Sequence, residues 1–125
     1  MRLLAGVLLT ALAAGCAADT AGAARAAERF TAALAAGQAE VACGLLARKT
    51  AEKLPGPGQS CAAALRELRL RAGGPVTEVS VWGDEAQVRL EGDTLFLRHF
   101  GDGWRVVAAG CVPVRDLPYE CEVED

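Results

Sequence analysis

Residues 85–111, EAQVRLEGDTLFLRHFGDGWRVVAAGC, decide the fold of this chain. Apolar and polar residues alternate over short runs in this stretch, and turns that contain glycine separate the runs. Such a pattern predicts a β-meander in which each strand has one apolar face. The three expected strands cover residues 85–90, 94–100 and 104–111, with turns at 91–93 and 101–103.

One more strand and a series of helices are expected before this meander. Residues 76–82 alternate in the same way, and Gly83-Asp84 fits a two-residue hairpin turn. Further upstream, apolar residues recur at helical spacing after Asp19 and Thr20, which are candidate N-caps. The expected helices are one that ends before Gly37, residues 39–47, a single turn at 51–54, and residues 61–71. Because an apolar sheet face needs a cover, the sequence predicts an α+β domain with N-terminal helices packed on a curved four-stranded antiparallel sheet.

Residues 1–15, MRLLAGVLLTALAAG, are typical of a secretory leader. Arg2 supplies a positive charge, and the apolar run at 3–14 is too short to span a bilayer as a stable helix. Small residues precede Cys16, which resembles the bacterial lipobox, where the cysteine thiol receives a diacylglycerol and becomes the new N-terminus. Ala13 stands where that pattern prefers Leu. An ordinary signal peptide cleaved nearby is the alternative.

This interpretation divides the chain into four parts. Residues 1–15 are the lipoprotein signal peptide, 16–21 the lipidated cysteine with a short tether, 22–121 a single domain, and 122–125 an acidic tail. Acyl chains on Cys16 would hold the domain at the extracytoplasmic face of the cell membrane, because each buried CH₂ contributes about 0.8 kcal/mol.

Four cysteines remain if Cys16 is acylated, and an even number in an exported chain predicts disulfides. Of the three possible pairings, we favour the pairs nearest in sequence, Cys43–Cys61 and Cys111–Cys121. Four buried free thiols are the alternative. A zinc site is not expected, because no two cysteines have CxxC spacing and the chain has one histidine.

The sequence offers few groups for catalysis, and no cofactor is expected. His99 has no acidic residue at useful spacing, so a structural role is expected for it. Tyr119 lies close to the C-terminus. Trp82 and Trp104 are expected to pack in the core or at its rim rather than form a ligand cage.

The charge pattern points to no nucleic-acid partner. The formal net charge is −3, and there is no strong basic patch. A modest basic edge at Arg66, Arg69 and Arg71 is expected to be a solvated helix face, with contact to lipid head groups as the alternative.

The run Asp102-Gly103-Trp104-Arg105-Val106 resembles the aspartate-glycine-tryptophan turn into the last strand of the nuclear-transport-factor-2-like (ketosteroid-isomerase-like, cystatin-like) superfamily. Over residues 28–121, the four cysteines and the tryptophan strand resemble small exported lipoproteins of high-GC Gram-positive bacteria, a group without an assigned activity. The four-cysteine pattern of that group implies the same disulfide pairings. The superfamily fold implies a pocket between helices and sheet, which here would be lined by Phe30, Leu34, Leu95, Leu97 and Trp104.

Two functions of different classes remain open. The first is a membrane-anchored, non-catalytic module that binds a small apolar ligand or another cell-envelope protein. The second is an isomerase or dehydratase that uses the pocket, which rests on fold analogy alone. Titratable side chains that converge in the pocket would favour the enzyme, whereas a pocket filled by its own lining would disfavour it. A homodimer through the open sheet face is compatible with either function.

Overall fold

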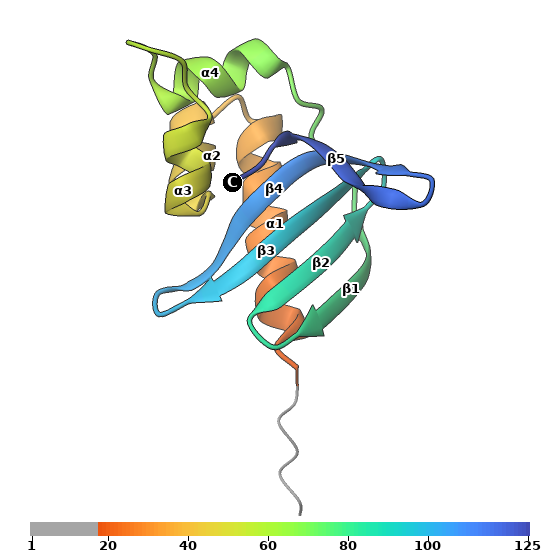
Figure 1. Ribbon diagram of the computed structural model, residues 1–125. Coiled ribbons are helices and arrows are strands. Elements are labelled where there is room, and N and C mark those ends of the chain that lie inside the picture. Colours follow the sequence, from red (N-terminus) through yellow and green to blue (C-terminus); the bar gives the residue numbers. More distant parts are fainter. Residues whose placement is uncertain (1–17) are drawn as a thin grey trace, which may run out of the picture.

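The computed structural model describes residues 18–125, which form four helices and five strands (Figure 1). The expected leader and Cys16 lie outside the described residues. The elements in chain order are α1 (Thr20–Ala35), α2 (Ala39–Leu45), α3 (Arg48–Lys53), α4 (Cys61–Leu68), β1 (Val76–Trp82), β2 (Glu85–Leu90), β3 (Asp93–Phe100), β4 (Gly103–Val114) and β5 (Leu117–Val123).

The strands form one antiparallel sheet in chain order. The α+β class and the antiparallel meander are therefore confirmed, but the sheet has five strands where the sequence predicted four. The additional strand is β5, which lies where we expected a tail. Val123 pairs with Ala109 of β4 and is fully buried, so the strand crosses the boundary expected at residue 121.

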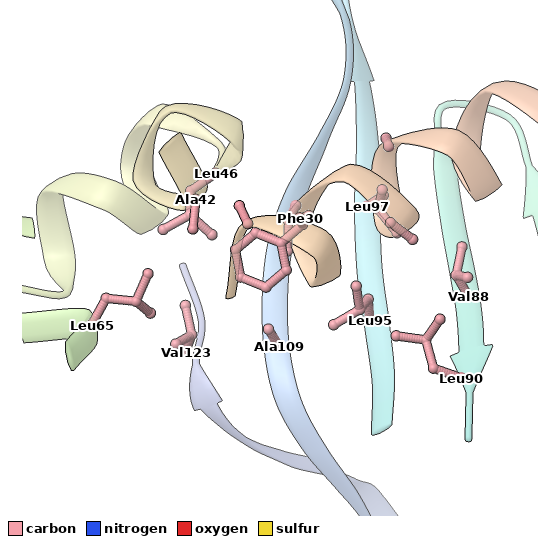
Figure 2. Packing of buried hydrophobic residues seen from close by; sticks show 14 of the residues in the cluster. Phe30, Ala42, Leu46, Leu65, Val88, Leu90, Leu95, Leu97, Ala109 and Val123 are labelled. Carbon is pink, nitrogen blue, oxygen red and sulfur yellow. The ribbon is translucent and has the colours of Figure 1, made fainter. Parts of the chain in front are cut away.

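Helix α1 covers one face of the sheet and carries the centre of the core (Figure 1). Its buried alanines allow a close approach to the strands, and Phe30 is its one large buried side chain. Figure 2 shows Phe30 with Ala42 and Leu46 on one side and Leu95 and Leu97 on the other. Burial of a side chain of this size contributes roughly 1.5–3 kcal/mol.

The segment that joins α2 to α3 covers the edge of β4 beside the bulge in that strand. Leu46 forms a parallel bridge with Val106, and the amide of Ala47 donates to the carbonyl of Val106 at 2.7 Å. Thr50 is buried and its hydroxyl donates to the carbonyl of Val107 at 2.9 Å. The single turn that we expected at 51–54 belongs to α3, which begins earlier, at Arg48.

Both disulfides join the pairs that the sequence predicted. Cys43 of α2 is bonded to Cys61 at the start of α4, and Cys111 of β4 to Cys121 directly opposite on β5. The hydroxyl of Ser60 accepts from the amide of Ala63 and caps α4. The two links therefore fasten the short helices to each other and the last strand to its neighbour.

Candidate functional site

Side chains fill the space between α1 and the middle of the sheet, where the sequence predicted a pocket. Phe30, Leu95 and Leu97 are at most 1% exposed and belong to the core (Figure 2). Leu34 is half-buried and borders a small pocket of about 200 Å³ beside α4. Of the expected lining, Trp104 borders a larger hollow at another place in the fold.

That hollow is a groove of about 620 Å³ between α1 and the β3–β4 hairpin. Its volume is within the range of small-molecule binding sites. We call it the α1 groove and define it by its polar and aromatic lining. Helix α1 supplies Asp19, Arg25, Glu28 and Arg29, and the hairpin supplies His99 and Trp104.

Asp19 joins the start of α1 to the sheet. It is the N-cap of α1, as expected, and one carboxylate oxygen accepts from the amide of Gly22 at 3.0 Å. The other oxygen accepts from the indole nitrogen of Trp104 at 2.9 Å. A Cβ atom on Gly22 would collide with this carboxylate, so the arrangement requires glycine at that position. The bond from Trp104, followed by the bond from Gly22, lowers the pKa of Asp19 below its ordinary value.

The imidazole of His99 packs edge-on against the indole of Trp104, with ring centroids 5.1 Å apart. A second hollow of about 420 Å³, bordered by Val81, Asp84 and the start of α1, shares these two rings and Asp19 with the groove. The amide of His99 donates to the carbonyl of Asp84 at 2.7 Å, which fixes the strand end against the β1–β2 turn. The two aromatic rings and Asp19 therefore form a wall with a hollow on each side.

Two arginines give the groove its donors. Arg25 and Arg29 are one helical turn apart, so they share a face of α1, and both are exposed. Within residues 18–125 neither of them takes part in an ion pair. Their guanidinium groups are thus available to an anionic or polar ligand. Glu28 lies between them in sequence and offsets part of this charge.

The arrangement suits binding better than acid–base chemistry. Both carboxylate oxygens of Asp19 already accept hydrogen bonds, and its pKa is lowered. An efficient general base has its pKa near the operating pH, and the shift at Asp19 goes the other way. In the part of the chain that the structure describes, no group of three or more His, Cys, Asp or Glu could hold a metal ion.

The basic edge of α4 lies apart from this groove. Arg66 forms an exposed ion pair with Glu40 of α2, and Arg66 and Arg69 border the small pocket beside Leu34. Figure 1 shows α4 at the end of the molecule opposite to the start of α1. The expected basic edge and the α1 groove are therefore separate surfaces.

Comparison with family models, curated protein sequences and solved structures finds no match. Among residues 18–125, no helix has the length and apolarity needed to cross a membrane.

The sequence indicated Asp19, His99 and Trp104 separately, and it did not predict that they lie in one site. Asp19 was expected only as a helix cap, and 85 positions separate it from Trp104. A usable signal did exist, because the N–H of a partly buried tryptophan usually finds an acceptor. No local pattern in the sequence indicated that a hairpin faces Arg25 and Arg29.

Proposed function

We propose that this protein is an exported lipoprotein, held at the outer side of the cell membrane by acyl chains on Cys16, and that it binds a ligand or another envelope protein in the α1 groove without catalysis. The observation that carries the export step is the pair of disulfides at Cys43–Cys61 and Cys111–Cys121. Disulfides persist in oxidising compartments, which agrees with a leader that ends at Cys16.

The order of helices before an antiparallel sheet supports membership of the nuclear-transport-factor-2-like superfamily. The filled interior gives this domain a binding site at the rim, between α1 and the β3–β4 hairpin, instead of a deep pocket. Trp104, which carries the resemblance, is the aromatic wall of that site.

The anchor is tested by Cys16→Ala in the intact chain, expressed in a bacterium that acylates lipoproteins. We expect the variant to be released into the medium or to accumulate as an unprocessed precursor, because the acyl acceptor is missing. Ala13→Leu is the matched control, since it moves the leader closer to the lipobox pattern and should leave processing intact. Mass spectrometry of the N-terminal peptide is the measurement, and normal membrane retention of Cys16→Ala would contradict the anchor.

The binding role is tested by mild cross-linking in intact membranes, followed by recovery of the protein with its neighbours. We expect Arg25→Ala with Arg29→Ala to lose the cross-linked species, because these side chains are the free donors of the groove. Arg71→Ala removes an exposed arginine elsewhere and should have no effect. Equal recovery in all three proteins would contradict binding of another protein in the groove.

An isomerase or dehydratase is the second candidate, because Asp19 and His99 border one groove. This candidate needs a carboxylate whose pKa is raised towards neutrality. We expect the opposite, a carboxyl pKa for Asp19 below its ordinary value, because Trp104 and Gly22 donate to the ionised form. A carboxyl titration followed by NMR decides between them, and a raised pKa would favour the enzyme.

A further inference from the structure

We propose that the α1 groove and the adjoining end of β1 rest on the phospholipid head groups of the membrane that carries the anchor. The inference names the occupant of the proposed binding site, and it rests on acylation of Cys16. Four observations carry it: the reach of the chain, the fixed start of α1, the residues gathered at this end, and their charge.

The reach of the chain places this end of the domain at the bilayer. Asp19 follows Cys16 by three positions along the chain. Even fully extended, three residues span no more than about 11 Å. An acylated Cys16 lies at the head-group level, because its chains are buried in the hydrocarbon layer. Asp19, and the groove that it borders, therefore cannot lie far from the membrane surface.

The chain also enters the domain in a fixed direction. The carboxylate of Asp19 is bonded to Gly22 within α1 and to Trp104 on β4, so the start of the helix cannot swing away from the sheet without breaking both bonds. Ala18 borders the second hollow, next to the turn between β1 and β2. Figure 1 shows the start of α1 and this turn at the same end of the molecule. A short tether fixed here orients the whole domain.

The residues at this end match the chemistry of a phospholipid interface. Tryptophan is enriched at the head-group level, where an apolar ring with one polar group is well solvated. Trp104 borders both hollows, and Trp82, at the end of β1, is 53% exposed. Arg25 and Arg29 present two guanidinium forks on one helical face, and this geometry suits phosphate oxygens.

The charge at this end is slightly negative. Asp19 and Glu28 in the groove offset Arg25 and Arg29, and Asp84 beside the groove adds one more carboxylate, so the surface has no positive field. Contact therefore depends on the anchor and on local phosphate contacts rather than on attraction to anionic lipid. We expect docking to be nearly the same on phosphatidylcholine vesicles and on vesicles of equal parts phosphatidylcholine and phosphatidylglycerol.

Tryptophan quenching by brominated acyl chains tests this orientation in the full, processed protein. Trp82→Phe leaves Trp104 as the reporter and keeps its bond to Asp19. The native protein adds Trp82 as a second reporter. The control adds Leu117→Trp to Trp82→Phe, at a position where the side chain is 65% exposed, and Figure 1 shows the β4–β5 hairpin away from the start of α1. The signal of each added tryptophan is the difference from Trp82→Phe alone. We expect each native reporter to lose at least about twofold more fluorescence than the control, because interfacial side chains lie roughly 5–10 Å into the head-group and acyl boundary.

Arg25→Ala with Arg29→Ala, placed in the Trp82→Phe protein, tests the phosphate contacts. We expect weaker quenching of Trp104 in this variant and unchanged quenching with Arg71→Ala. Mass spectrometry of each preparation establishes whether Cys16 is acylated. Absence of the acyl group overturns the anchor and the orientation together. Acylated protein whose three reporters are quenched equally, or not at all, overturns the orientation and leaves the anchor standing.

Discussion

The two ends of this domain are held together by different chemistry. At one end, disulfides join α2 to α4 and β4 to β5, and Leu68 of α4 and Cys111 border one hollow. At the other end, α1 is joined to the hairpin by the hydrogen bond between Asp19 and Trp104 and by aromatic packing. Helices of seven and eight residues have little stability of their own, whereas α1 has 16 residues and a full apolar face. Within residues 18–125, the covalent links occur where the helices are short, and the end with the groove has none.

The largest expected effect on this contrast comes from removing the link between the short helices. Replacing Cys43 and Cys61 together with Ala should lower the free energy of unfolding by about 3 kcal/mol, because the disulfide closes a loop of 18 residues. Urea unfolding followed by circular dichroism gives the value. In the folded variant we expect the α1 groove to be intact, with unchanged NMR shifts at Trp104. Changed NMR shifts at Trp104 would show that the two ends are not independent.

A smaller effect is expected at Asp93, which reinforces the disulfide end without a covalent bond. Its carboxylate accepts from the amides of Gly110 and Cys111 at 3.2 and 3.0 Å. Asp93→Ala should lower the free energy of unfolding by roughly 1–3 kcal/mol, because partly buried donors lose their acceptor. Asp93→Asn is the control, and its free energy of unfolding should decrease by only part of this amount. Equal stability of the alanine variant and the native protein in urea would show that water replaces the carboxylate.

The smallest expected effect is the pH dependence at the groove end. The pKa of Asp19 is lowered in the folded protein, so its stabilising contribution is complete above the ordinary carboxyl pKa and is lost as the pH falls through the folded value. The stability difference between the native protein and Asp19→Asn should therefore shrink as the solution is acidified. Thermal unfolding across the acidic range measures it, and a difference that grows on acidification would contradict the assignment.

The meander and the helices could be predicted from the sequence, because alternation and caps are local signals. The turn at 83–84 and the cap at Asp19 agree with the structure, and the turn expected at 91–93 is one residue shorter, because β3 begins at Asp93. β5 was missed because Pro118 and four acidic residues after it are typical of a tail. β5 also makes side-chain contacts with β2 and β3, which lie earlier in the chain. Tyr119 packs on Phe96, with ring centroids 5.2 Å apart, and its hydroxyl accepts from Gln87.

The site could be predicted only in pieces, because it is made by a helix start and a hairpin that lie far apart in the chain. Trp104 was expected at a pocket, and it does border the groove. Phe30, Leu95 and Leu97 were placed in the same pocket by analogy with a fold whose interior is open. Here alanines bring α1 close to the sheet, so these three side chains fill the interior themselves. A sequence pattern records which residues are apolar, and not the distance between the layers that bury them.

The link between Cys43 and Cys61 encloses α3 and the exposed loop Pro55-Gly56-Pro57-Gly58 within one covalent ring. A protease that nicks this loop would leave both fragments attached, and the segment against β4 would still be tethered at both of its ends. The cut molecule would migrate as an intact chain on a gel until a reductant was added. The disulfide would thus keep the domain in one piece after a cut in this loop.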